Sequence, residues 1–123
     1  MPAVKKILIV DDSVAESRLM QSYLQQAGYW AVVLGDPTRL EQMIDMERPQ
    51  LILLDVVMPT RNGFQACREL KSNTAYGMIP VVLVTSKSLD SDKFWGRQQG
   101  ADGYLVKPFT REQLLGEIQR LLH

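Results

Sequence analysis

Groups that could handle a metal ion and a phosphoryl group stand at the ends of four apolar stretches of this chain. They are the acids Asp11, Asp12 and Asp55, the hydroxyls of Thr85 and Ser86, and the amine of Lys107. Three carboxylates gathered in one place repel one another, and desolvation increases the cost. A hard divalent cation such as Mg²⁺, which prefers oxygen ligands, would relieve that repulsion.

The same set of side chains suits chemistry at phosphorus. A carboxylate beside a cation can act as a nucleophile, while a hydroxyl and an ammonium stabilise charge on the phosphoryl oxygens. Taken singly, each residue has an ordinary explanation: Asp12 as a helix cap, Thr85 as a strand residue, Lys107 as a solvated lysine. This chemistry therefore requires a fold that brings these side chains together.

The alternation of strands and helices along the chain predicts such a fold. Strands are expected over residues 6–10, 30–34, 51–55, 80–86 and 103–107, with those at 51–55 and 80–86 buried. Helices are expected between Ser13 and Gly28, between Asp36 and Pro49, over about 64–72, between 91 and Gly100, and from Thr110 onward. This alternation is typical of an α/β fold, a five-stranded parallel sheet with helices on both faces and right-handed crossovers. The carboxyl ends of such strands share one edge, where ligands bind.

Two helix starts carry capping-box patterns, Ser13-x-x-Glu16 and Thr110-x-x-Gln113, in which side chains satisfy the free amides of the first turn. Trp30, Met58 and Cys67 are interpreted as packing residues.

Composition narrows the function classes. The chain has 123 residues, with 14 Lys and Arg against 14 Asp and Glu. Because basic residues are not in excess, the composition does not indicate nucleic acid or an anionic membrane as the main partner. Cys67 and His123 are too few for a zinc site or an internal disulfide. No apolar segment approaches the ~20 residues that span a bilayer, and no signal peptide is visible. We expect one domain over 1–123, without an output domain, in the cytoplasm.

The order of these motifs resembles the receiver domain of two-component response regulators, with CheY-like single-domain regulators as the nearest type. The resemblance covers the whole chain and implies the flavodoxin-like strand order 2-1-3-4-5. Within the family, the stretches 92–101 and 62–66 look most like regulators of type IV pilus twitching motility or phototaxis.

The resemblance implies roles residue by residue. Asp55 would be the phosphoacceptor, charged by the phosphohistidine of a histidine kinase or a histidine phosphotransfer domain. The other implied roles are Mg²⁺ (or Mn²⁺) binding by Asp11, Asp12, Asp55 and the Val57 backbone carbonyl, phosphoryl contact by Thr85 and Lys107, and switching by Thr85 with Tyr104. The Lys107–Pro108 peptide bond would be cis. Such a protein is not an enzyme in the usual sense, since it catalyses only its own phosphotransfer and dephosphorylation.

Two positions depart from the chemotaxis type. Val57 stands where that type has an amide, and Lys87 where it has an acid. Both positions flank the path of the hydrolytic water in the family, and Val57 cannot orient that water. We therefore expect a longer-lived acyl phosphate.

The family signals through its fourth helix, fifth strand and fifth helix, which predicts an output face toward a downstream protein. That face would include Lys93, Trp95, Arg97, Tyr104 and Gln113, with Trp95 equally compatible with a core position. A monomer or weak dimer is expected. The alternatives that stay open are a phosphate sink that drains the kinase, a phosphohydrolase, a flavin carrier, and a binding module independent of phosphate.

Overall fold

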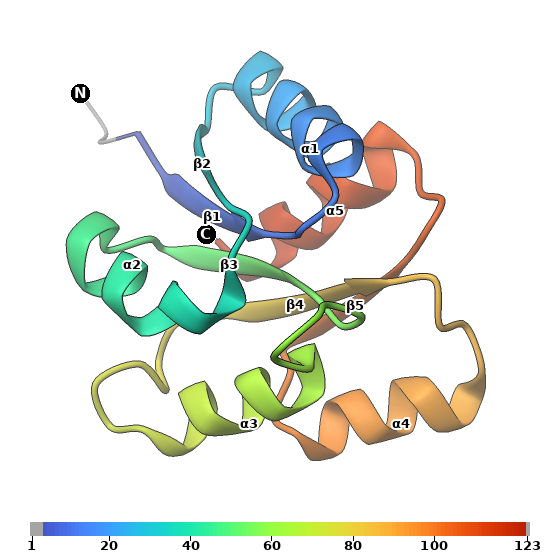
Figure 1. The fold of residues 1–123 in the computed structure, drawn as a ribbon. Coiled ribbons are helices and arrows are strands. Elements are labelled where there is room, and N and C mark those ends of the chain that lie inside the picture. The colour runs from blue at the N-terminus through green and yellow to red at the C-terminus, as the bar shows by residue number, and fades with distance from the viewer. Residues whose placement is uncertain (1–3, 123) are drawn as a thin grey trace.

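The computed structural model describes residues 4–122 as alternating strands and helices (Figure 1). The strands are β1 (Lys6–Val10), β2 (Trp30–Leu34), β3 (Leu51–Asp55), β4 (Val81–Thr85) and β5 (Gly103–Val106). The helices are α1 (Val14–Gln26), α2 (Leu40–Glu47), α3 (Gly63–Ser72), α4 (Asp90–Gln98) and α5 (Arg111–Leu121), with a 3₁₀ turn η1 (Pro37–Arg39) before α2. The predicted elements are all present, and their ends differ from the prediction by only a few residues.

The five strands form one parallel sheet in the order β2-β1-β3-β4-β5, as predicted. Its register places Val10 beside Leu54 and Asp55 beside Val84. The carboxyl ends of β1, β3, β4 and β5 therefore lie along one edge, and the residues that follow them are brought close together.

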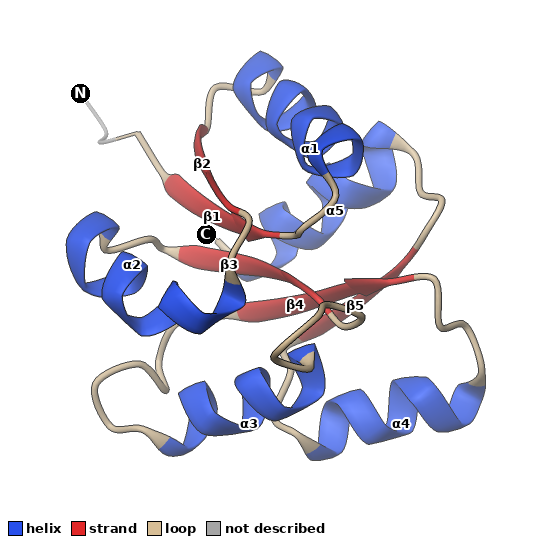
Figure 2. Ribbon diagram, in the orientation of Figure 1, coloured by secondary structure: helices blue, strands red, loops and turns tan. Residues whose placement is uncertain are grey.

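Helices cover both faces of the sheet: α1 and α5 one face, α2, α3 and α4 the other (Figure 2). Alternate residues of each strand enter separate cores. Along β4, Val82 and Val84 pack with Met20 of α1, whereas Leu83 packs with Leu70 of α3. Because both faces are buried, the central strands read as continuous apolar runs rather than alternating ones.

The helix caps correct one prediction. Thr110 and Gln113 form the expected reciprocal box at α5, with hydrogen bonds of 3.1 and 2.8 Å. At α1 only half of the box exists: the Ser13 hydroxyl accepts from the Glu16 N–H at 3.3 Å. The Ser13 N–H donates instead to Asp11 Oδ1 at 2.9 Å, which leaves the Glu16 carboxylate free to bind elsewhere.

Trp30 is a second correction, because it is 60% exposed rather than packed. It begins β2, at the edge of the sheet, and the Lys6 ammonium lies 5.1 Å from its ring centroid. This is a cation–π arrangement, in which the cation is attracted to the electron-rich ring face. Met58 and Cys67 are buried, as predicted.

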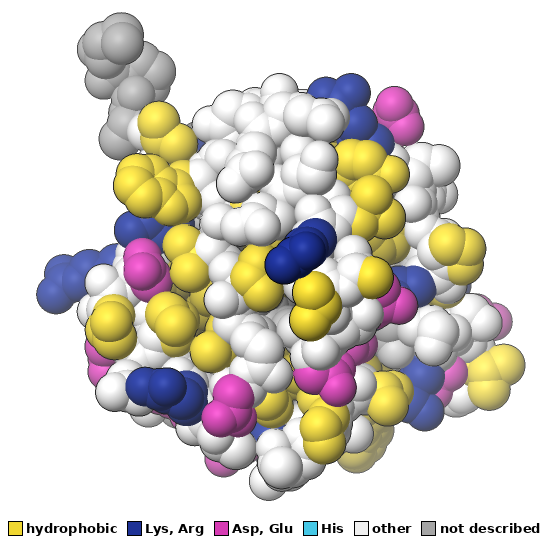
Figure 3. Space-filling view, turned by 45° about the horizontal axis from the view of Figure 1, so that its top comes forward, with side chains coloured by type: hydrophobic (Ala, Val, Ile, Leu, Met, Phe, Trp, Pro, Cys, Tyr) yellow, Lys and Arg dark blue, Asp and Glu magenta, His cyan; other side chains and the backbone are white. Residues whose placement is uncertain are grey.

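The surface is mixed in charge. On the face in Figure 3, acidic and basic side chains are scattered among polar and hydrophobic ones rather than gathered by sign. Within residues 4–122, no helix combines the length and the apolar character needed to cross a bilayer.

Candidate functional site

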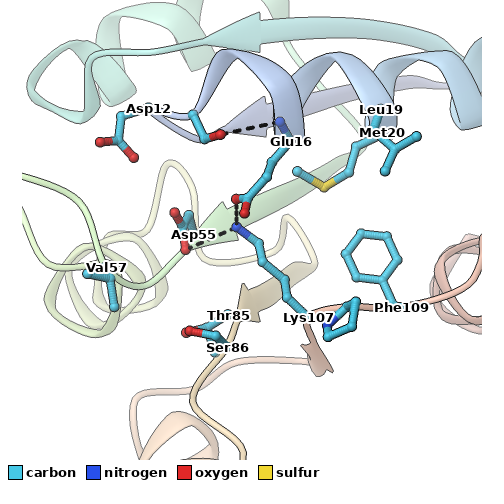
Figure 4. Close-up of a pocket in the computed structure, with 12 residues that line it drawn as sticks. Asp12, Glu16, Leu19, Met20, Asp55, Val57, Thr85, Ser86, Lys107 and Phe109 are labelled. Carbon is cyan, nitrogen blue, oxygen red and sulfur yellow. Dashed lines mark hydrogen bonds and ion pairs between the residues drawn. The ribbon is translucent and has the colours of Figure 1, made fainter.

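The strand ends converge on a cavity of about 500 Å³ at the carboxyl edge of the sheet (Figure 4). Its polar wall carries Asp12, Asp55, Thr85 and Lys107, and Asp11 lies beneath them. Asp11, Asp55 and Thr85 are buried, whereas Asp12 is exposed. Residues up to 96 positions apart in the chain are thus assembled into one polar site.

Three carboxylates lie at one end of this site. Asp11, Asp12 and Asp55 each present an oxygen within 4.8 Å of the others. Hard oxygen donors beside a water-accessible cavity are what Mg²⁺ or Mn²⁺ requires, so the residues present fit such an ion. Val57 lines the same cavity next to Asp55, and its backbone N–H interacts with the Asp55 carboxylate.

Burial changes the acidity of Asp55. Desolvation raises its pKa to about 6, against the attraction of Lys107 and the Val57 N–H, and the charge of Asp11 adds to the rise. The carboxylate is therefore held in a poorly solvated position beside another acid, where any added positive charge would stabilise its ionised form.

Lys107 reaches into the cavity from the end of β5 and faces three carboxylates. Its Nζ lies 3.2 Å from Asp11 Oδ2 and 3.7 Å from Asp55 Oδ1, and it is in close contact with Glu16 Oε2. Burial lowers the pKa of Lys107, but the hydrogen bond to Glu16 and the charges of Asp11 and Asp55 outweigh it, so the net pKa is raised. The amine is thus held as an ammonium. The Lys107–Pro108 peptide bond is cis, as the resemblance implied.

Gly63 fixes the backbone behind Asp55. Its N–H donates to the Val56 carbonyl at 2.9 Å, and a Cβ at this position would lie 2.2 Å from the Asp55 carbonyl oxygen. Only glycine allows the start of α3 to approach β3 this closely. Local spacing in the sequence does not reveal this contact.

Thr85 and Tyr104 meet at the loop after β4. The Thr85 hydroxyl accepts from the Lys87 N–H at 3.2 Å, and the Tyr104 hydroxyl donates to the Lys87 carbonyl at 2.7 Å. The backbone of Lys87 thereby links the two residues predicted to switch together. The Lys87 side chain is exposed and is not among the residues that line the cavity, whereas Val57 is.

The predicted output face is largely accessible. Trp95 is half-exposed, which resolves its position in favour of the surface. Arg97 and Gln113 are exposed, while Lys93 and Tyr104 are partly buried.

Glu16 is the residue of the site that the sequence analysis missed. Its capping-box spacing assigned it to the amides of α1, yet its carboxylate binds Lys107. A clue was present, because an acid four residues after Asp12, one turn into the helix, lies on the side of the helix that can face the strand ends.

Comparisons with known proteins agree with this geometry. The response regulator receiver domain family matches residues 7–119. The chain is 41% identical over 120 residues to protein PilH of Pseudomonas aeruginosa, covering 95% of this chain and 97% of PilH. It is 35% identical over 114 residues to PilG of the same organism, covering 93% and 84%.

Solved structures give the same result. The Vibrio cholerae chemotaxis protein CheY4 superposes with a TM-score of 0.90 at 33% identity, covering 98% of this chain and 100% of CheY4. The chain spans about half the length of several further relatives, which are named as transcriptional regulators.

Proposed function

We propose that this chain, which belongs to the response regulator receiver domain family, is a phosphorylation-activated switch. The phosphoryl donor would be the phosphohistidine of a histidine kinase or a histidine phosphotransfer domain, and the acceptor Asp55. The acyl phosphate would then change which downstream protein binds. A covalent charge at one site that biases a two-state element is a general switching device.

The geometry supports the following reaction. An Asp55 carboxylate oxygen attacks phosphorus, a P–O bond forms, the P–N bond to the imidazole breaks, and the electron pair stays on the imidazole nitrogen. Lys107, 3.7 Å from Asp55, stabilises the charge on the transferred oxygens, and the Thr85 hydroxyl lines the same cavity. A bound Mg²⁺, held by Asp11, Asp12 and Asp55 with the Val57 carbonyl, would neutralise further negative charge.

One observation carries the proposal: a buried carboxylate with a raised pKa faces a lysine ammonium and two more acids around an open cavity. Two other functions fit less well. A phosphohydrolase usually needs a second acid for the leaving group, and the apolar Val57 occupies that position. A flavin phosphate would be repelled by Asp11 and Asp12 after β1.

The relatives suggest a biological setting. PilH and PilG are full-length or nearly full-length matches, so we infer a role in motility driven by type IV pili, inside the cytoplasm. The downstream partner would bind the face formed by α4, β5 and α5, where Trp95 and Arg97 are accessible. Large aromatic residues and Arg are common at the centres of interfaces.

Incubation with acetyl phosphate and MgCl₂, followed by intact mass spectrometry, tests the proposal. We expect a gain of one phosphoryl group that reverses over time and requires the divalent cation. Sustained release of phosphate from varied monoesters would favour the hydrolase, and no mass gain at all would contradict the switch.

Val57 provides a test of the phosphate lifetime. Its side chain lines the cavity without a polar group, so it cannot orient an attacking water. We expect Val57→Asn to speed the loss of the phosphoryl group several-fold, because an amide can hold that water in line. Decay of the phosphorylated mass after removal of acetyl phosphate measures the rate. Asp90→Asn serves as the comparison, since that exposed side chain does not line the cavity. An unchanged rate in Val57→Asn would show that the Val57 side chain does not set the phosphate lifetime.

A further inference from the structure

Glu16 places an extra carboxylate against the lysine of the site. It lies in the first turn of α1, and the Ser13 N–H that it would cap is already bound to Asp11. The freed carboxylate lines the cavity and meets Lys107 Nζ (Figure 4). Of the three carboxylates around that ammonium, Glu16 is the nearest and Asp55 is the farthest.

The three contacts differ in how firmly they are held. The Asp11 side chain is 1% exposed and is fixed by the Ser13 N–H, so it cannot leave without losing its hydrogen bonds. The Glu16 side chain is 50% exposed and can rotate into water at little cost, whereas the Lys107 side chain is only 13% exposed. Glu16 is therefore the partner that Lys107 exchanges most easily.

A phosphoryl group on Asp55 needs the same ammonium. It would add negative oxygens near Asp55 Oδ1, which is now 3.7 Å from Lys107 Nζ, beyond hydrogen-bonding distance. Those oxygens would share one ammonium with Glu16, and the contact with Glu16 opposes any movement of Lys107 toward them.

We propose that Glu16 is a positioning residue that competes with the phosphoryl group for Lys107. In the unphosphorylated protein it holds the ammonium toward α1, and phosphorylation releases it to solvent. This inference rests on the proposed function, because it assigns Glu16 a part in the same reaction.

The first experiment measures the affinity for beryllofluoride, a tetrahedral mimic of the phosphoryl group, by ¹⁹F NMR with magnesium held in large excess. We expect Glu16→Gln to tighten binding about threefold to fivefold, the factor that one partly exposed ion pair contributes. Glu16→Asp keeps the charge but is one methylene shorter, so it should tighten binding as well. Asp90→Asn, which removes an exposed acid from the first turn of α4, is the matched control and should change nothing.

The second experiment detects the contact directly. Limiting acetic anhydride acetylates free amines, and peptide mass spectrometry gives the reactivity of Lys107 relative to Lys93. Without magnesium or beryllofluoride, we expect the relative reactivity of Lys107 to rise several-fold in Glu16→Gln and to stay unchanged in Asp90→Asn. A merely structural role of Glu16 would not make this one amine more reactive.

The outcomes separate the two proposals. If the unmodified protein binds no beryllofluoride and takes no phosphoryl group, the proposed function fails. If it does both, but Glu16→Gln binds no tighter or Lys107 reactivity does not change, competition by Glu16 is overturned while the switch stands. If Glu16→Asp behaves as the unmodified protein while Glu16→Gln does not, charge rather than reach is responsible, and the positioning role is likewise overturned.

Discussion

Replacing Asp55 with Asn is expected to abolish incorporation of the phosphoryl group and, in the same protein, to raise the free energy of unfolding. The first effect follows because an amide cannot attack phosphorus as a carboxylate can. The second follows because Asp55 is buried beside Asp11, and desolvation raises its pKa to about 6. Removing a charge from such a position relieves repulsion.

The stability effect has a defined pH dependence. The pKa of Asp55 is higher in the folded protein, about 6, than the ordinary value of 3.8, so the folded state binds the extra proton between those values. Its contribution to stability is present below about pH 4 and is lost as the pH rises through 6. The advantage of Asp55→Asn should therefore grow over this interval, to about 3 kcal/mol at most.

Urea unfolding in EDTA at several pH values between 4 and 7 measures this difference. Asp90→Asn, which removes an exposed acid from the first turn of α4, should follow the unmodified protein over that interval. If the free energy of unfolding changes with pH in the same way for Asp55→Asn and the unmodified protein, burial does not destabilise the ionised Asp55.

Among the glycines of residues 4–122, replacement of Gly63 by Ala should be the most destabilising. A methyl group there would lie 2.2 Å from the Asp55 carbonyl oxygen and 2.6 Å from the Val56 Cα, both backbone atoms that cannot move aside cheaply. We expect the free energy of unfolding to fall by about 3 kcal/mol or more, as for severe overpacking. Phosphoryl incorporation should fall too, because the displaced backbone carries the acceptor.

Gly116→Ala is the matched control for this prediction. Gly116 lies inside α5, and a Cβ there meets nothing within 4 Å. Alanine should therefore raise the stability by up to about 1 kcal/mol through its better helix propensity. Chemical denaturation compares the two variants, and the interpretation of Gly63 fails if both alanines are tolerated equally.

The sequence predicted the fold and the polar edge because both depend on short-range patterns. The apolar runs before Asp11 and Asp55 mark strands buried on both faces, and one parallel sheet brings their ends beside the end of β5, which Lys107 follows. The helix cap formed by Thr110 and Gln113 was likewise predictable from the sequence, since both partners lie within one helical turn.

Contacts between distant residues were not predictable in the same way. Glu16 could cap its own helix or bind Lys107, and only the position of an amine 91 residues later decides between them. The exposure of Trp30 depends on β2 being an edge strand, and the need for glycine at position 63 depends on how closely α3 approaches β3. None of these is visible in local spacing.

The contact between Lys107 and Asp11 joins the last strand to the first across 96 residues. If Asp55 is the acceptor, as proposed, a nascent chain would lack the complete site until β5 has been synthesised and has docked beside β4. A fragment that ends before β5 would carry Asp55 but not the ammonium that completes its surroundings. Under the proposed function, the capacity for signalling would be acquired late in biosynthesis, when the ammonium joins the carboxylates.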